Sequence, residues 1–154
     1  MAIAQPAGTI SPDVSPDIGA IRAVIAAVEA AYHAKDAAAI ARHYAPGAII
    51  ADLAPPLRRR GLDTSATQAW LDGWDGPVEL TTHDLEIQVD GNLALCHGLQ
   101  HTQVRACSGE QVAWWSRITL ALARQPAGWR VMHEHSSVPF HMDGSFRTAL
   151  DLKP

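Results

Sequence analysis

The sequence has little charge, only two cysteines and no long hydrophobic run among its 154 residues. Lys and Arg number 12 against 16 Asp and Glu, and the net charge of -4 argues against a nucleic-acid-binding surface. No window approaches the roughly 18 apolar residues of a membrane span, so we expect no association with a membrane. Because Cys96 and Cys107 form neither a disulfide framework nor a Cys-x-x-Cys metal motif, we expect a reduced, cytoplasmic chain.

The sequence also lacks the short motifs of several large enzyme classes. It contains no Gly-x-Gly-x-x-Gly, no Walker loop and no Gly-x-Ser-x-Gly elbow. These absences weigh against dinucleotide, ATP and α/β-hydrolase functions, and the sequence implies no cofactor. Residues 1–15 lack the basic and apolar segments of a secretory signal. We expect a flexible tail at residues 1–16 and a single domain at residues 17–154.

Hydrophobic residues make up 47% of the chain, which excludes a disordered protein. A domain of this length buries about 68–70% of the surface of its unfolded chain, so it can hold a core without disulfides or metals. The composition includes 8 His and 5 Trp but only 2 Phe and 2 Tyr. Such amphipathic rings suit a polar-lined pocket, and they also fit an ordinary core.

Apolar residues recur every three or four positions in the first half of the chain and at every second position in the second half. The first pattern predicts a helix from Asp17 that carries Ile21, Ile25 and Val28 on one stripe. Further helices are expected at residues 37–44 and 63–74, and strands at residues 48–52, 78–89, 93–104, 111–124 and 129–138. This order predicts an α+β fold in which helices pack on one face of a curved, mostly antiparallel sheet.

Asp52 is the first candidate for chemistry, because it follows an apolar strand and precedes a loop that contains Pro55 and Pro56. A carboxyl group among apolar side chains has a raised pKa, which suits a general acid or base. A turn-forming aspartate at the end of a strand explains the same residue. The basic run at residues 58–60 follows in this loop, and we interpret it as a surface loop rather than an anion clamp.

The last expected strand carries two histidines. Strand alternation places His133, His135 and Ser137 on the same face as the tryptophan and valine of this strand, which predicts that both imidazoles point inward. Glu134 falls on the opposite face, and we interpret it as a solvated or interface carboxylate. Inward histidines need hydrogen-bond partners, so the pattern fits either a functional site or a buried polar ladder.

The strand at residues 111–124 has two faces of different polarity. One face carries Trp115, Arg117 and Thr119, and the other is more apolar, so hydrophobicity alone would bury the second and leave Arg117 in solvent. A sheet covered on both sides would allow Arg117 to point inward, with Asp52 as its partner. The residues alone leave this alternative open.

Two more histidines, His97 and His101, share one face of the strand at residues 93–104. Together with His133 and His135 they provide four imidazoles, and a His-x-His pair on a strand is one way to present metal ligands. No complete ligand motif is present. A metal-dependent enzyme is therefore an alternative, and we name no metal ligand.

Two stretches resemble a known family. Residues 36–61 contain the pattern Asp-x-x-x-Ile-x-x-x-Tyr-Ala, followed by a short strand that ends in Asp52, a proline-containing loop and a helix. The last strand has the form Trp-x-x-x-His-x-His-x-Ser-x-Pro. Over residues 17–154 the chain resembles the ketosteroid isomerase-like family of the NTF2-like, SnoaL-like superfamily, and in particular its branch of uncharacterised ketosteroid isomerase homologues.

The resemblance implies a cone of helices over a strongly curved sheet, a mostly apolar pocket and a homodimer formed through the outer face of the sheet. It also implies that Arg117 faces the pocket and that Asp52 matches the proton-shuttling base of the family. The two oxyanion donors of the family are not matched. No Tyr stands at the expected position near Val28, since Tyr32 lies one turn further on, and no Asp lies near Arg117 or Thr119. Each such donor contributes about 2.7–4 kcal/mol, so we expect no 3-oxosteroid isomerisation.

We therefore expect an isomerase, cyclase or lyase that transfers a proton next to a carbonyl group of a small apolar or polyketide-like ligand. Asp52 would act as base, His135 as acid or hydrogen-bond donor, and Arg117 as anion stabiliser. The alternative is a non-catalytic ligand-binding or protein-interaction module in which Asp52 and Arg117 neutralise each other. The residues expected to bind the ligand are Tyr32, Trp70, Trp115, His97, His101, His133 and Ser137.

Overall fold

The structure is a computed structural model that describes residues 15–154. The flexible tail expected at residues 1–16 lies outside these residues except for its last two positions. Each helix begins after a short polar residue whose side chain accepts hydrogen bonds from backbone N–H groups of the first turn, which have no partner within the helix. These pairs are Ser15 and α1 (Pro16–His33), Asp36 and α2 (Ala37–Ala41), and Asp63 and α3 (Thr64–Asp72).

Six strands form one sheet, in the order β2-β1-β6-β5-β4-β3. Strands β1 and β6 are parallel, and the other neighbouring strands are antiparallel. The parallel pair brings residues from the first and last thirds of the sequence side by side. The strands are β1 (Tyr44–Ala51), β2 (Arg59–Arg60), β3 (Glu79–Asp90), β4 (Leu93–Arg105), β5 (Gln111–Gln125) and β6 (Gly128–Ser137).

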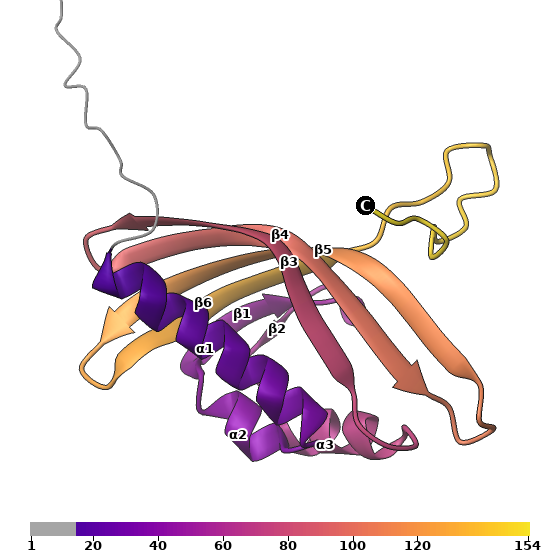
Figure 1. The fold of residues 1–154 in the computed structure, drawn as a ribbon, viewed down its shortest axis with the longest axis horizontal. Coiled ribbons are helices and arrows are strands. Elements are labelled where there is room, and N and C mark those ends of the chain that lie inside the picture. Colours follow the sequence, from indigo (N-terminus) through magenta and orange to yellow (C-terminus); the bar gives the residue numbers. More distant parts are fainter. Residues whose placement is uncertain (1–14) are drawn as a thin grey trace, which may run out of the picture.

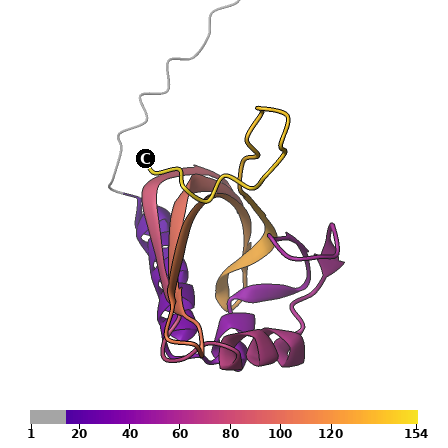
Figure 2. The same ribbon diagram turned by 90° about the vertical axis from the view of Figure 1, so that its right-hand side faces the viewer.

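The sheet is strongly curved, and the helices lie on its concave side (Figure 1, Figure 2). Helix α1 runs along the sheet, and helices α2 and α3 lie near the C-terminal end of α1 (Figure 1). These observations confirm the expected α+β fold, with helices packed on a curved, mostly antiparallel sheet. Buried apolar side chains from the helices and the inner face of the sheet form the core. They include Ile21, Ile25, Ile40, Ile50, Leu71, Val78, Cys96, Leu122 and Val131.

A β-bulge in β3, between His83 and Glu86, bends the edge of the sheet. Within the bulge, Asp84 has a positive φ of 49°. Gly98 of β4 lies opposite, and a Cβ atom at this position would be 2.7 Å from the carbonyl oxygen of His83. The glycine therefore allows the bulged strand to approach β4 closely.

The helices and strands expected from the sequence agree with the structure to within a few residues over most of the chain. The main difference lies at residues 42–47, which the sequence pattern assigns to the end of a helix and a connection. Helix α2 instead ends at Ala41, and β1 begins at Tyr44. The short strand β2, which the sequence does not predict, pairs with β1 through Arg59 and Arg60.

After β6 the chain continues as an irregular segment that projects from the sheet (Figure 1). Phe140 and Thr148 form an isolated β-bridge within it. Phe140, Met142 and Phe146 have exposed side chains. In the part of the chain that the structure describes, no helix combines the length and the apolar character needed to cross a membrane.

Candidate active site

A cavity of about 590 Å³ lies between the concave face of the sheet and helices α1 and α3. Its volume lies within the usual range of small-molecule sites. Burial of an apolar ligand surface against this wall is favourable, because it removes that surface from water. The wall is mainly apolar and aromatic, with contributions from Val24, Ile25, Val28, Trp70, Val78, Leu80, Leu85, Trp114, Ile118, Leu120 and Val131.

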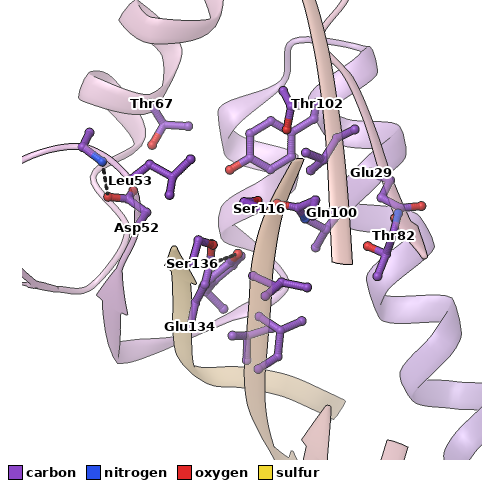
Figure 3. Close-up of a pocket in the computed structure, with 18 of the residues that line it drawn as sticks. Glu29, Asp52, Leu53, Thr67, Thr82, Gln100, Thr102, Ser116, Glu134 and Ser136 are labelled. Carbon is purple, nitrogen blue, oxygen red and sulfur yellow. Dashed lines mark hydrogen bonds between the residues drawn. The ribbon is translucent and has the colours of Figure 1, made fainter. Parts of the chain in front are cut away.

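Glu134 of β6 points into this cavity (Figure 3), and its carboxylate accepts a hydrogen bond from the Tyr44 hydroxyl of β1. Burial raises the pKa of Glu134, and the hydrogen bond from Tyr44 offsets part of this rise. The charge of Asp52 raises the pKa of Glu134 further, whereas the charge of Arg59 lowers it. A carboxyl group with a raised pKa is suited to general acid and base catalysis near neutral pH.

Two tyrosines line the same region of the cavity. Burial raises the pKa of both Tyr32 and Tyr44, and the negative charge of Glu134 raises both values further. Both phenols are therefore protonated at neutral pH and act as hydrogen-bond donors. Tyr44 donates to Glu134, whereas within residues 15–154 the Tyr32 hydroxyl has no hydrogen-bond partner. Of the two phenols, Tyr32 is thus the one that can donate to a ligand.

Asp52 directly follows β1 and forms an ion pair with Arg59 of β2 at the wall of the cavity. Arg59 donates to both carboxylate oxygens, with 3.3 Å between Nη1 and Oδ1. The backbone N–H of Ala54 donates to Oδ1 over 3.3 Å (Figure 3). These bonds stabilise the carboxylate and occupy its lone pairs, so Asp52 is less available than Glu134 to take a proton from a ligand.

Neutral polar side chains cross the inner face of the sheet. Gln100 and Thr102 of β4, Ser116 of β5 and Ser136 of β6 face the cavity (Figure 3). The cavity therefore combines an apolar wall, one acid–base group and several neutral hydrogen-bonding groups, which is the usual composition of a small-molecule site.

The family model of the SnoaL-like domain matches residues 21–141. The matched segment includes α2, α3, all six strands and most of α1. The chain belongs to the SnoaL-like family. This membership confirms the SnoaL-like family expected from the sequence. No curated protein matches the chain.

Solved structures of NTF2-like proteins resemble this SnoaL-like chain. An NTF2-like protein of unknown function from Pseudomonas putida is 29% identical, with a TM-score of 0.75 over 87% of this chain and 94% of that chain. An NTF2-like protein with a cystatin-like fold from Novosphingobium aromaticivorans is 24% identical, with a TM-score of 0.63 over 90% of each chain. An NTF2-like superfamily protein from Salmonella enterica is 20% identical, with a TM-score of 0.69 over 81% of this chain and 92% of that chain. These likenesses establish the fold, and the reaction has to be inferred from the site.

A bulge in β6 of the SnoaL-like sheet changes which side chains face inward. The neighbouring residues Ala121 and Leu122 of β5 pair with His133 and Val131 of β6, which are two positions apart. Met132 is therefore an extra residue that has no partner in β5. After such an extra residue, every later side chain of the strand lies on the face opposite to the one that simple alternation gives.

The bulge places Glu134 and Ser136 on the cavity side of β6. The interpretation of Glu134 as a solvated or interface carboxylate is therefore wrong. The inward position expected for His133, His135 and Ser137 is wrong for the same reason, and none of these three residues lines the cavity. His135 is thus not placed to act as an acid or a donor toward a ligand in it.

The structure shows which of the two faces of β5 points into the cavity. Its even-numbered residues from 114 to 120 line the cavity, so alternation puts Trp115 and Arg117 on the outer face. There the Trp115 ring stacks on His101, with 4.5 Å between ring centroids, and lies 4.9 Å from the ring of His83. Hydrophobicity alone gives the observed face, and the inward position of Arg117 that the resemblance implied is wrong. Trp115 and His101 do not line the cavity either.

Four of the expected site residues do line the cavity: Asp52, Tyr32, Trp70 and His97. The Trp70 and Tyr32 rings pack edge-to-face, with 6.4 Å between their centroids. The His97 side chain is 47% exposed, and its imidazole lies 3.7 Å from the carboxylate of Glu86. Alternation along β4 puts this side chain on the same face as His101, so His97 borders the cavity but does not point into it. The four histidines do not converge, and within residues 15–154 no three His, Cys, Asp or Glu side chains are grouped to hold a metal ion.

The sequence interpretation missed Glu134, Tyr44 and Arg59 as site residues. Tyr44 belongs to the family pattern at residues 36–45, which indicated only the fold. No local signal reveals Glu134, because the bulge that turns it inward depends on how β5 pairs with β6. Arg59 had a usable signal, since it lies seven residues after Asp52 across a proline-containing loop that folds back on itself. The interpretation of residues 58–60 as a surface loop is wrong for Arg59.

Proposed function

We propose that this protein is an enzyme that transfers a proton next to a carbonyl group of a small ligand, acting as an isomerase, cyclase or lyase. The observation that carries the proposal is the half-buried Glu134, whose carboxyl group Tyr44 holds in a mostly apolar cavity. Classical 3-oxosteroid isomerisation is not part of the proposal, because the carboxylic-acid donor of that reaction has no Asp near Arg117 or Thr119 to match it, and Tyr32 lies one turn beyond the position of the tyrosine donor.

In the proposed reaction, the ligand carbonyl oxygen accepts a hydrogen bond from Tyr32. Glu134 takes a proton from the carbon next to the carbonyl group, and the electron pair of that C–H bond forms an enolate. Protonation of the enolate at another carbon gives an isomer, attack on a second carbonyl gives a ring, and loss of a leaving group gives a lyase product. A single oxyanion donor such as Tyr32 typically contributes about 2.7–4 kcal/mol to transition-state stabilisation.

In this proposal Asp52 is not the catalytic base that the sequence suggested. Its carboxylate is paired with Arg59, and its charge raises the pKa of Glu134. A higher pKa makes the Glu134 carboxylate a stronger base once it is ionised. Asp52 therefore acts through Glu134 as a positioning residue, and Arg59 holds Asp52 in place.

Proton exchange into a simple ketone tests this proposal without knowledge of the natural substrate. We suggest para-phenylcyclohexanone, a cyclohexanone with a phenyl group opposite the ketone, in heavy water, with loss of its α-proton signals followed by NMR. We expect exchange above the buffer rate with the wild type. Glu134→Gln should reduce it by about 10²–10⁴-fold, the range for loss of a general base. Glu110→Gln, in an exposed turn, is the matched control and should leave exchange unchanged.

A non-catalytic ligand-binding module is the second candidate, and the largely apolar cavity wall favours it. It requires that the ketone bind while its α-protons exchange no faster than in buffer. The metal-dependent alternative has no support from the four histidines, since they do not converge within the described residues.

We also propose a homodimer formed through the outer face of the sheet. Leu93 and Leu95 on this face are 56% and 45% exposed, and the stacked rings of Trp115 and His101 lie on the same face, further along β4 and β5. Association of two such faces would bury these apolar groups. A cytoplasmic location is part of the same proposal, since Cys96 and Cys107 are both free thiols.

A further inference from the structure

Three polar side chains are buried in the part of the chain that the structure describes: Thr102, Ser116 and Ser136. Their exposed fractions are only 4%, 3% and 8%. All three line the same cavity, together with Gln100 (Figure 3). This concentration on the inner face of the sheet is notable because a hydroxyl group in an apolar wall costs free energy unless it is hydrogen-bonded.

Three of these polar residues form a compact group on β4 and β5. Gln100 lies directly opposite Ser116 in the antiparallel ladder, and Thr102 is two residues further along β4 on the same face. Directly opposite residues have Cβ atoms about 4.5–5.5 Å apart, so the amide of Gln100 and the hydroxyl of Ser116 can reach one ligand atom. We refer to Gln100, Thr102 and Ser116 as the distal polar group.

The distal polar group is separate from the acid–base site. Glu134 pairs with Leu120 on β5, and Ser116 lies four residues further along this strand. Four residues of strand correspond to about 13 Å. A ligand that contacts both places therefore has to be elongated.

The side chains of the distal polar group have no protein partners. Within residues 15–154, Gln100, Thr102 and Ser116 form no side-chain hydrogen bond. Buried polar groups in folded proteins are almost always hydrogen-bonded, so this group is suited to bind polar atoms of a cavity occupant. Hydroxyl and amide groups both donate and accept, so they recognise an uncharged hydroxyl, amide or carbonyl function.

The charges that line the cavity disfavour an anionic ligand. Among the described lining residues are the carboxyl groups of Glu29, Asp52, Asp63 and Glu134, against a single Lys or Arg side chain, that of Arg59. Arg59 is already paired with Asp52. A ligand carboxylate would lose its hydration and meet no free guanidinium or ammonium group, which makes its binding unfavourable.

We infer that the distal polar group is a second binding subsite, and that the ligand is an uncharged, elongated molecule with a polar function at each end. One end carries the carbonyl group that reacts at Glu134, and the other carries a hydroxyl or amide group that binds Gln100, Thr102 and Ser116. The identity of the reacting end rests on the proposed function. The second subsite and the exclusion of anions rest on the cavity alone.

Equilibrium binding of three matched ketones tests this inference. They are para-phenylcyclohexanone and its derivatives with a hydroxyl or a carboxylate at the far end of the phenyl ring. Quenching of tryptophan fluorescence reports binding, because Trp70 and Trp114 line the cavity. We expect the hydroxy ketone to bind about fivefold more tightly than the parent, as one added hydrogen bond gives. The carboxylate should bind more weakly than the parent.

Two nearly isosteric variants test whether the preference for the hydroxy ketone comes from the distal polar group. Ser116→Ala and Thr102→Val should each reduce the preference for the hydroxy ketone over the parent. Thr119→Val, on the outer face of β5, is the matched control and should retain the full preference. Circular dichroism of each variant establishes that it is folded.

Three results would overturn the inference: no preference for the hydroxy ketone, a preference that survives both variants, or tighter binding of the carboxylate. These measurements require no turnover, so they are independent of the proton-exchange assay. A protein that shows the preference but exchanges no protons would contradict the proposed reaction and support the second subsite.

Discussion

The chemistry of the cavity depends on how Glu134 shares it with neighbouring charges and hydrogen-bond donors. Burial raises the pKa of Glu134, and the negative charge of Asp52 adds to the rise. Tyr44 donates to the carboxylate and lowers the pKa, as does the positive charge of Arg59. The net direction is upward, so the carboxylate is poised as a stronger base than an exposed glutamate.

Opposite changes around Glu134 should shift its pKa in opposite directions. Asp52→Asn removes a negative charge and frees Arg59, and both effects favour the ionised carboxylate, so the pKa of Glu134 should fall. Tyr44→Phe removes a hydrogen bond to the ionised form, so the pKa should rise. Carboxyl carbon NMR across a pH titration measures both, with Glu134→Gln used to assign the signal. A rise in the Asp52→Asn variant would contradict this electrostatic assignment.

At the scale of strands, two β-bulges determine what reaches the cavity. The bulge at Met132 turns Glu134 and Ser136 inward, and the bulge between His83 and Glu86 bends the edge strand. Alternation within one strand predicts faces correctly only until an extra residue appears. A bulge depends on pairing with a neighbouring strand, which the sequence of the bulged strand does not encode by itself.

The sequence therefore predicts the fold better than the site. Local periodicity and turn residues are enough to predict the helices and the long strands, because they depend on neighbours in sequence. The faces of β5 follow from the apolar character of Ile118 and Leu120. The inward position of Glu134 depends on strand pairing and could not be predicted in this way, whereas Arg59 had a signal in its spacing from Asp52. Asp52 was found at the cavity because it directly follows an apolar strand.

Gly98 is the residue on which the bulged edge of the sheet most depends. Gly98→Ala would place a Cβ atom 2.7 Å from the His83 carbonyl oxygen, so the backbone of β3 or β4 would have to move. We expect a loss of about 1–3 kcal/mol in the free energy of unfolding, typical of overpacking. Urea unfolding followed by circular dichroism measures it.

Gly19 provides a control in which a change from glycine to alanine should raise the free energy of unfolding instead of lowering it. It lies within α1, and a Cβ atom there meets nothing within 4 Å. Gly19→Ala should therefore stabilise the protein by about 0.5–1 kcal/mol, since alanine is the better helix former. Equal stabilities of Gly98→Ala and wild type would show that the bulge does not require a glycine.

At the scale of the whole molecule, the two faces of the sheet differ in what they carry. The concave face, covered by the helices, encloses the cavity, and the outer face carries Leu93, Leu95 and Trp115. A second copy of the chain on this face would cover its exposed leucines.

A single charge should separate the proposed homodimer. Leu95→Lys introduces an ammonium group among the exposed leucines of the outer face, and its two copies would lie in the same interface. We expect a dimer for the wild type and a monomer for this variant in sedimentation velocity. Leu57→Lys is the control, since Leu57 is 98% exposed in the loop between β1 and β2. A monomeric wild type would contradict the proposed dimer.

The pH dependence of α-proton exchange into para-phenylcyclohexanone tests most directly whether Glu134 is the base. The rate should rise with pH as Glu134 loses its proton, with a midpoint above the ordinary pKa of glutamate, and then reach a plateau. Glu134→Gln should abolish both the rise and the enzymatic rate, while Asp52→Asn should move the midpoint to lower pH. Exchange that survives in Glu134→Gln, with the same midpoint as the wild type, would contradict the assignment of Glu134 as the base.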